Sequence, residues 1–187
     1  MTRIVAGALG GRRIAAPPGA GTRPTSDRVR EALFSAVEAE VDLDGARFAD
    51  LYAGSGAVGL EALSRGARHV LLVESDPRAA RVIRENVATL GVGPAARLVA
   101  GRVATALAAG PDGGPYDVVF ADPPYAVPDE EITALLATLV GGGWLVPDAL
   151  VVVERSSRTR QFDWVDGITP DRSRRYGETT LWYGRRS

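Results

Sequence analysis

The stretch DLYAGSGAVG, from Asp50 to Gly59, places glycines at positions 54, 56 and 59 directly after an apolar run. A G-x-G-x-x-G pattern is informative when it joins a strand to a helix, because glycines let the backbone approach a ligand closely. Both neighbours fit, since residues 46–52 are a strand candidate and residues 58–64 have a helical pattern. The stretch therefore predicts an adenosine-type cofactor beside the first turn of an α/β sheet.

Strand and helix patterns alternate along most of the chain. Apolar strand candidates occupy residues 46–52, 69–73, 97–100, 117–121 and 149–153, and helical patterns occupy residues 58–64, 77–90, 103–108 and 130–140. Residues 161–185 alternate instead, which favours an antiparallel hairpin at a sheet edge. Because β-α repetition needs helices that cross over a sheet, we predict a Rossmann-like α/β fold. It has a mostly parallel, seven-stranded sheet with helices on both faces.

An N-terminal extension precedes this repeat. Residues 4–14 are Gly-rich and alternating, which suggests a small β-hairpin, and residues 17–24 resemble a loop. Ser26 can cap a helix whose apolar residues recur at every fourth position, which are Val29, Leu33, Val37 and Val41. We therefore divide the chain into an extension over residues 1–24 and an α/β domain over residues 25–187.

Composition excludes several classes of protein. There is no cysteine, so disulfides and thiolate metal sites are excluded and a reducing compartment is favoured. His69 is the sole histidine, and no metal cluster can be assembled around it. The N-terminus lacks the apolar core of a signal peptide, and no apolar stretch is long enough to span a bilayer. We expect a cytoplasmic protein without a metal and without a membrane partner.

Charge is distributed unevenly along the chain. Residues 1–30 carry six arginines and one acid, residues 31–154 eight arginines and eighteen acids, and residues 155–187 eight arginines and four acids. Every basic residue is arginine, whose planar fork suits phosphate. A single arginine is usually a solvated surface residue, but two basic ends favour a polyanion held by both termini.

Two carboxylates accompany the glycine turn. Glu74 lies twenty residues beyond Gly54, at the end of the second strand candidate, where it can accept both hydroxyls of a ribose. A nicotinamide dinucleotide would suit these features too, but Asp50 would then face a pyrophosphate with like charge. The same carboxylate would attract the ammonium and sulfonium of S-adenosylmethionine. A strand-end turn or a helix cap is the alternative for Asp50.

The tetrapeptide DPPY follows the apolar residues 118–121 and consists of Asp122, Pro123, Pro124 and Tyr125. Proline has no N–H, so the segment offers backbone carbonyls and a carboxylate as acceptors with few competing donors. An exocyclic amine of a nucleobase carries two hydrogens that such acceptors can orient, and a carboxylate favours the charge that develops on its nitrogen. Tyr125 can stack on a base turned out of its helix or loop. We interpret DPPY as the target-amine site, with a turn and a packed tyrosine as the alternative.

These motifs together resemble class I methyltransferases that act on amino nitrogens. Three stretches make the resemblance more specific than this broad class. They are RPTSDRVREALF at residues 23–34, AGSGA at residues 53–57 and LEALSRG at residues 60–66. They are similar to the RsmD family, whose bacterial enzymes methylate N2 of a guanine in 16S ribosomal RNA. The resemblance runs from Arg3 to the final hairpin. It implies S-adenosylmethionine as cofactor and 16S rRNA or an assembling small ribosomal subunit as partner.

The resemblance also implies roles for particular residues. The methionine part of the cofactor would be held by Asp50, Ala53, Gly54, Ser55 and Gly56, and its ribose by Glu74. Ser75 and Asp76 would lie beside the adenine, and Asp122 to Tyr125, with Asp122 also at the cofactor, would hold the target amine. One departure is Gly101-Arg102-Val103, which stands where many class I enzymes place an Asp or Asn for adenine. Adenine contact there would fall to backbone groups of Arg102 and Val103.

The RNA-binding face would include the N-terminal hairpin in this family. The arginines that the resemblance assigns to it are Arg3, Arg12, Arg13, Arg23 and, at the start of the first helix, Arg28. A DNA adenine-N6 or cytosine-N4 methyltransferase is the main alternative, since DPPY is shared with those enzymes and phosphates attract arginine in either polymer. An NAD(P)-binding oxidoreductase is a distant alternative that leaves DPPY unexplained. A non-catalytic RNA-binding module would not need the cofactor turn.

Overall fold

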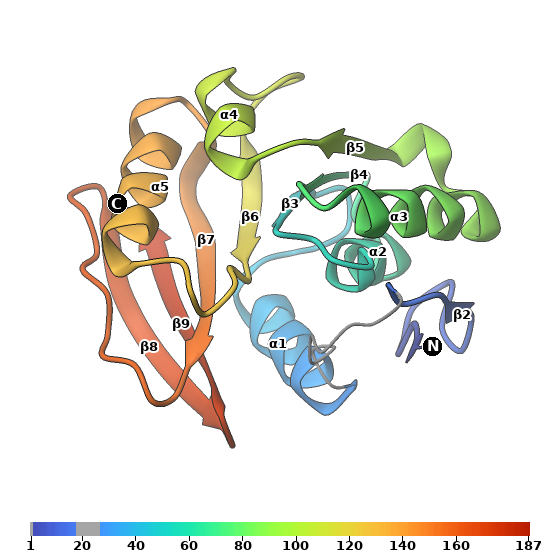
Figure 1. Ribbon diagram of the computed structural model, residues 1–187, viewed down its shortest axis with the longest axis horizontal. Coiled ribbons are helices and arrows are strands. Elements are labelled where there is room, and N and C mark those ends of the chain that lie inside the picture. Colours follow the sequence, from blue (N-terminus) through green and yellow to red (C-terminus); the bar gives the residue numbers. More distant parts are fainter. Residues whose placement is uncertain (1, 18–26) are drawn as a thin grey trace.

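The strand order of the central sheet is β5-β4-β3-β6-β7-β9-β8 in the computed structural model, which describes residues 2–17 and 27–187 (Figure 1). The strands are β3 (Arg47–Leu51), β4 (His69–Glu74), β5 (Ala96–Ala100), β6 (Tyr116–Ala121), β7 (Leu145–Ser156), β8 (Ile168–Tyr176) and β9 (Thr179–Arg186). The first five are parallel, whereas β9 is antiparallel to both β7 and β8. The predicted seven-stranded, mostly parallel sheet with a C-terminal edge hairpin is confirmed.

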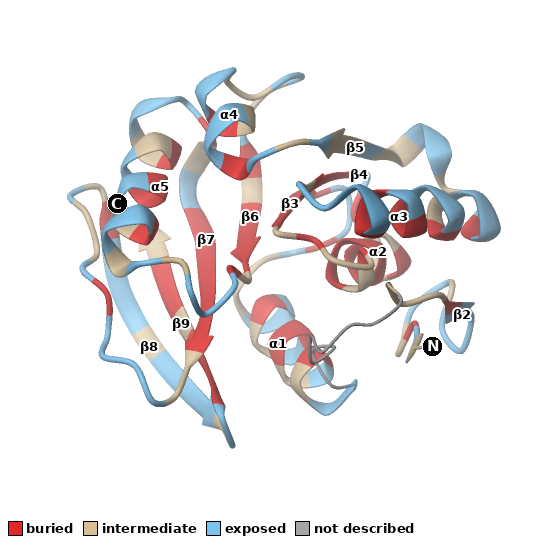
Figure 2. Ribbon diagram, in the orientation of Figure 1, coloured by how far each residue is buried: buried red, intermediate tan, exposed pale blue. Residues whose placement is uncertain are grey.

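Helices cover both faces of this sheet. The helices are α1 (Asp27–Glu40), α2 (Ala57–Ser64), α3 (Pro77–Leu90), α4 (Val103–Ala108) and α5 (Asp129–Gly141), with a short 3₁₀ turn at Gly93–Ala95. Side chains of a strand alternate between faces, so Phe48 and Val118 pack with α1, α2 and α3, while Ala49 and Val119 pack with α4 and α5. The central strands are accordingly buried on both sides (Figure 2). Within the described residues, no helix is long and apolar enough to cross a bilayer.

Local sequence explains where α2 and α3 begin. Asp76 caps α3 by accepting a hydrogen bond from the Arg78 N–H at 3.0 Å, and Pro77 occupies the first turn. Helix α2 starts after Gly56, whose φ of 82° suits glycine. A Cβ at Gly59 would lie 2.6 Å from Leu72 Cδ2. The third glycine of the motif therefore lets α2 pack closely on β4.

The predicted N-terminal β-hairpin is present, but its first strand lies before residues 4–14 and its ladder is short. Strands β1 (Thr2–Arg3) and β2 (Arg13–Ile14) pair antiparallel over two residues each. The connection folds onto α2 instead of continuing the ladder, and a Cβ at Gly7 (φ +86°) would lie 2.0 Å from the Ser64 carbonyl oxygen. Ile4 and Ile14 form a small apolar cluster with Leu60 and Leu90. The expected boundary at residues 24 and 25 and the Ser26 cap lie outside the described residues.

Strand order reverses between β3 and β6. Strands β4 and β5 lie on one side of β3, and β6 and β7 lie on the other. The last residues of the two central strands, Leu51 and Ala121, are register partners, so both strands end at the same edge. Ligands of such sheets bind outside the carboxyl ends of the strands at the switch point. The glycine turn and DPPY both leave the sheet there.

Candidate active site

The DPPY segment begins beside the glycine turn. The Asp122 N–H donates to the Leu51 carbonyl at 3.3 Å, which extends the pairing of β3 with β6 by one hydrogen bond. Tyr52 follows with a φ of 61°, a conformation that a non-glycine residue adopts at a cost of roughly 1–3 kcal/mol. The Ala53 N–H then donates to the Val73 carbonyl at 2.9 Å. The two motifs that the sequence singled out are thus neighbours at one sheet edge.

Glu74 connects the glycine turn to the start of α3. Its Oε1 accepts from the Gly54 N–H at 2.7 Å, and its Oε2 accepts from the Asp76 N–H at 2.9 Å. Each carboxylate oxygen can accept a second hydrogen bond, so the side chain, which is partly exposed, can still receive hydroxyl groups. Ser75 and Asp76 are exposed next to it. The residues predicted to contact the ribose and the adenine are therefore neighbours at the carboxyl end of β4.

Asp50 is buried, with 1% of its surface exposed, and its Oδ2 accepts from the Gly59 N–H at 2.8 Å. The helix contact that we considered as its alternative role is therefore present. Burial raises the pKa of Asp50 well above 3.8, the Gly59 hydrogen bond opposes that rise, and the charges of Asp122 and Glu74 add to it. The charges of two other predicted site carboxylates thus reach Asp50, and such a concentration of negative charge suits a cationic ligand. Among the described residues, no group of three or more His, Cys, Asp or Glu is placed to hold a metal ion.

The DPPY loop has a buried start and an exposed end. Pro123 is buried, whereas Pro124 and Tyr125 are exposed. Tyr125 has 45% of its surface exposed and is the one exposed large apolar side chain of the described residues. The Pro124 carbonyl accepts from the Val127 N–H at 3.0 Å and from Arg155 Nη1 at 3.4 Å. The expectation of open carbonyl acceptors therefore needs a correction at Pro124, whose oxygen is engaged within the protein.

Arg155 holds this loop, and the sequence did not indicate it. The residue lies near the end of β7 and is 2% exposed. Its Nη2 donates to the Val127 carbonyl at 2.8 Å and lies 3.3 Å from Asp129 Oδ1. Burial and the charge of Glu131 raise the pKa of the Tyr52 hydroxyl, and the nearby charge of Arg155 partly opposes that rise. A buried guanidinium therefore links β7, the DPPY loop and the start of α5.

Asn86 is a second residue that sequence reasoning missed. It lies on α3, is 2% exposed, and is the only asparagine of the chain. Its Oδ1 accepts from the Ala15 N–H at 2.8 Å, and its Nδ2 donates to the carbonyls of Ala15 at 2.9 Å and Ser55 at 3.0 Å. One side chain thus joins the end of the N-terminal hairpin to the glycine turn.

The weaker adenine candidates lie at the start of α4. Arg102 is exposed at the N-cap position and makes no side-chain cap. The Val103 side chain is 5% exposed and packs in the core with Leu107. The Gly101 N–H donates to the Glu74 carbonyl at 3.0 Å, which holds this turn beside the end of β4. The Val103 side chain is thus taken up by the core, and the backbone groups of Arg102 and Val103 remain the candidates for adenine contact.

The arginines predicted to bind RNA lie on the surface where the structure describes them. Arg3, Arg13 and Arg28 are exposed, and so is Arg12, whose Nη2 donates to the Thr89 carbonyl at 2.8 Å. Arg23 lies outside the described residues. The hairpin therefore presents several cations on the flank formed by α2 and α3.

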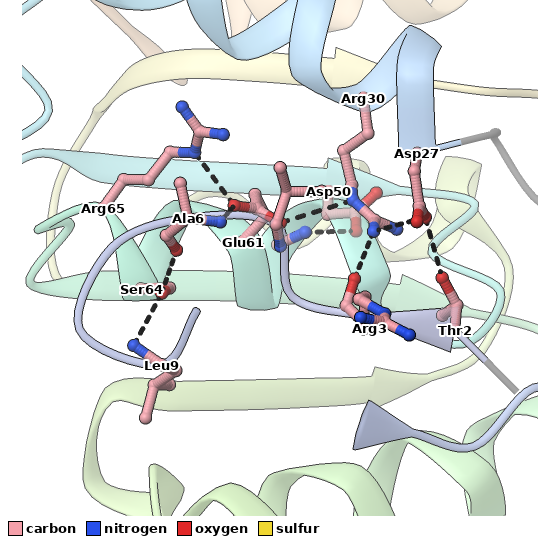
Figure 3. A network of polar contacts seen from close by, with 12 residues as sticks. Thr2, Arg3, Ala6, Leu9, Asp27, Arg30, Asp50, Glu61, Ser64 and Arg65 are labelled. Atoms are coloured by element: carbon pink, nitrogen blue, oxygen red, sulfur yellow. Dashed lines mark hydrogen bonds and ion pairs between the residues drawn. The ribbon is translucent and has the colours of Figure 1, made fainter. Parts of the chain in front are cut away.

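A buried polar network anchors the hairpin (Figure 3). Glu61 on α2 is fully buried and accepts from the N–H groups of Val5 at 2.8 Å and Ala6 at 3.0 Å. The same carboxylate pairs with Arg30 Nε of α1 at 3.3 Å and with Arg65 Nε at 2.9 Å. Glu61 therefore connects the hairpin, α1 and α2, and Asp27 adds a second acid that accepts from Thr2 Oγ1 at 3.2 Å and pairs with Arg30 Nη2 at 3.0 Å.

The model of the family described as Conserved hypothetical protein 95 matches residues 2–185. The chain belongs to this family. Its curated relatives include Ribosomal RNA small subunit methyltransferase D of Escherichia coli strain K12, which is 43% identical over 152 residues, 81% of this chain and 73% of that protein. The putative rRNA methyltransferase YlbH of Bacillus subtilis is 33% identical over 178 residues, 95% of each chain.

The fold of this member of the Conserved hypothetical protein 95 family is also found in a solved structure. The putative methyltransferase yhhF from Escherichia coli superposes with a TM-score of 0.84 and 34% identity, covering 100% of this chain and 98% of that one. The RsmD resemblance and the class I methyltransferase fold expected from the sequence are therefore confirmed.

Proposed function

We propose that this protein transfers a methyl group from S-adenosylmethionine to the exocyclic N2 amine of a guanine in 16S rRNA. A relative named for small-subunit rRNA methylation supports the RNA class. The observation that carries the proposal is the Asp122–Leu51 hydrogen bond of 3.3 Å, because it holds a target-amine loop against the cofactor turn. We also propose that the enzyme works in the cytoplasm, where small ribosomal subunits assemble.

S-adenosylmethionine is the methyl donor, and the residues at the switch point fit it. When bound, it supplies an electrophilic methyl group on a cationic sulfur. The carboxylate of Asp50, with Asp122 and Glu74 nearby, provides the negative potential that attracts a sulfonium and an ammonium. We assign Ala53, Gly54, Ser55 and Gly56 to the methionine part and Glu74 to the ribose. The adenine side is assigned to Ser75, Asp76 and the backbone of Arg102 and Val103.

Asp122 and the proline backbone orient the target amine in this proposal. The amine hydrogens point at the Asp122 carboxylate and at the Pro123 carbonyl, because the Pro124 carbonyl is engaged by Val127 and Arg155. This orientation would turn the nitrogen lone pair toward the methyl group of a bound S-adenosylmethionine, where formation of the N–C bond would accompany cleavage of the C–S bond. Asp122 stabilises the positive charge on nitrogen and accepts the proton that leaves. Tyr125 stacks on the extruded base.

The N-terminal hairpin binds the RNA backbone in this proposal. Arg3, Arg12, Arg13, Arg23 and Arg28 provide the cations, and phosphate contacts of this kind position RNA without reading its sequence. A guanine in a loop or bulge is then accessible to Tyr125 without opening a long duplex.

Acceptor specificity tests the proposal. The protein is incubated with methyl-labelled S-adenosylmethionine and, separately, an unmodified 16S rRNA transcript, small ribosomal subunits that lack the modification, and double-stranded DNA. We expect label in the rRNA of one or both ribosomal acceptors and none in DNA. Label confined to DNA would overturn the rRNA assignment and favour the amino methyltransferases of DNA.

A further inference from the structure

The β8–β9 hairpin ends at the same sheet edge as the DPPY loop. Ser156, the last residue of β7, is the register partner of Thr179, the first residue of β9. The Ser157 N–H donates to the Glu178 carbonyl at 2.8 Å, so the chain leaving β7 remains in contact with the hairpin tip. The tip therefore extends from the carboxyl edge of the sheet, where cofactor and target amine meet.

Strand register gives the separation between this tip and the catalytic loop. Arg155, which bonds the Pro124 and Val127 carbonyls, pairs with Thr180 on β9, and Thr180 pairs with Arg175 on β8. Neighbouring strands lie about 4.8 Å apart, so the backbone of Arg175 is about 10 Å from that of Arg155. A nucleic acid whose base reaches the loop would pass within reach of arginine side chains on the tip.

Four arginines gather at this end of the sheet, and we name them the tip arginines. They are Arg158 and Arg160, which follow β7, and Arg174 and Arg175, which end β8. All four are exposed, and β8 is open to solvent along most of its length (Figure 2). Glu178 is the one acid in residues 155–160 and 172–178, and it lies 3.7 Å from Arg158 Nη2. The surface retains a net positive charge.

Edge protection alone does not account for the tip arginines. Charged residues on an edge strand do discourage pairing with another sheet. Arg158 and Arg160, however, lie after β7 and outside the edge strand. Arg172, which does lie in the middle of β8, is directed to Glu40 at 3.8 Å and is left out of the set. The free positive charge is thus concentrated near the reactive edge.

We propose that the tip arginines bind phosphates of the RNA that flanks the target nucleotide. This inference rests on the proposed rRNA methyltransferase function. The N-terminal hairpin packs on α2 and α3, over the β4–β5 side of the switch point, whereas the tip belongs to strands on the β7 side. The RNA is therefore held from both flanks of the catalytic loop. Arginine suits this role because its fork matches phosphate oxygens.

Salt-dependent RNA binding tests this surface. The double variant Arg174→Gln, Arg175→Gln is compared with Arg68→Gln, Arg97→Gln, which removes the same charge from exposed positions toward the amino ends of β4 and β5. The probe is an unmodified 16S rRNA transcript, titrated over a series of KCl concentrations. We expect the tip variant to bind about tenfold more weakly near about 0.1 M salt, with a log–log slope shallower by about 1.4 for two lost contacts. The control should retain the wild-type slope.

The outcomes separate this inference from the function on which it rests. If the tip variant and the control have the same affinity and slope, the tip does not bind RNA, even where the wild type methylates it. If the wild type methylates no rRNA, the proposed function itself is wrong. Calorimetry of S-adenosylmethionine binding verifies that each variant is folded. Arg158→Gln, Arg160→Gln lies outside the strands and gives the same test should the β8 variant fail to fold.

Discussion

Arg155 Nη2 and the Val127 carbonyl oxygen are 2.8 Å apart, and this hydrogen bond joins the end of β7 to the loop after β6. The guanidinium is buried and reaches the loop mainly through backbone carbonyls. A loop rich in proline has few N–H groups with which to stabilise itself. Its shape therefore depends on a donor that belongs to a different strand.

Replacing Arg155 should slow the chemical step more than it weakens cofactor binding. In Arg155→Met the Val127 carbonyl loses its guanidinium donor and the Pro124 carbonyl keeps only the Val127 N–H, so the target amine loses its alignment. We expect kcat to fall about 10- to 100-fold, since a displacement of about 1 Å can cost that much. The affinity for S-adenosylmethionine, measured by calorimetry, should change less than about twofold.

Two companion variants make the Arg155 result interpretable. Arg155→Lys keeps a donor and should recover part of kcat, which a purely structural loss would not predict. Arg185→Met removes a different arginine, one that pairs with Glu40 at 2.9 Å, and should leave kcat near the wild-type value. Equal losses of kcat and cofactor affinity in Arg155→Met would contradict a positioning role.

Asn86→Ala should weaken S-adenosylmethionine binding, although the buried side chain acts only by supporting the glycine turn. The change removes the donor to the Ser55 carbonyl and both bonds to Ala15. We expect the dissociation constant to rise about tenfold, equivalent to about 1.4 kcal/mol. Arg84→Ala, an exposed position on the same helix, serves as the control. Unchanged affinity in Asn86→Ala would show that the turn does not need this support.

Glu61→Gln should strongly destabilise the fold. The amide removes the buried carboxylate that pairs with Arg30, whose other ion pair, at 3.0 Å, is with the exposed Asp27. Breaking a buried pair in this way costs about 3–5 kcal/mol, whereas Glu38→Gln, at a half-exposed partner of Arg65, should cost about 1 kcal/mol or less. Urea unfolding measures both values. Similar values for the two variants would refute the central place of Glu61.

Asp50→Asn should stabilise the ligand-free protein and weaken cofactor binding. The amide oxygen can still accept from Gly59, and a buried charge is removed. Folding raises the pKa of Asp50, so above pH 3.8 the native state binds more protons than the unfolded state. As pH rises from 3.8 toward the pKa of the folded state, this carboxyl therefore makes the fold progressively less stable. The wild type should therefore lose stability relative to Asp50→Asn between acidic and neutral pH. Thermal unfolding over a pH series measures this difference.

Cofactor affinity should follow the opposite pH trend. S-adenosylmethionine is attracted by the ionised carboxylate, so its affinity for the wild type should fall as acid protonates Asp50. The affinity of Asp50→Asn should be lower at neutral pH, by about tenfold for one lost charge contact, and flatter with pH. Parallel pH profiles for the two proteins would argue against a direct electrostatic role.

Local patterns were sufficient to predict most of the fold. Apolar runs and helix signals fixed the alternation of strands and helices, because each element shows its own periodicity. The predicted hairpin over residues 4–14 missed its first strand, β1, and the alternation within that range does not extend the ladder, because the connection packs against Ser64, a contact 55 residues or more away in sequence. Such a contact leaves no local signal.

The candidate site likewise contains residues that local sequence predicted and residues that it did not. The convergence of Asp50, Gly54, Glu74 and Asp122 could be predicted because each lies at or just beyond the carboxyl end of a strand, and parallel strands end at one edge. Asn86 and Arg155 could not, because their partners are backbone groups of distant segments. A carbonyl or N–H group is present at every residue, so the sequence does not indicate which of them a buried side chain meets.

The identity of the methylated nucleoside tests the central claim most directly. An unmodified 16S rRNA transcript or small ribosomal subunit is incubated with the protein and S-adenosylmethionine, digested to nucleosides and analysed by mass spectrometry, with Asp122→Ala as the matched control. We predict N2-methylguanosine from the wild type and almost none from the variant, whose loss of cofactor affinity, measured by calorimetry, should be far smaller than its loss of product. N6-methyladenosine as the product, or an undiminished yield from Asp122→Ala, would contradict the account.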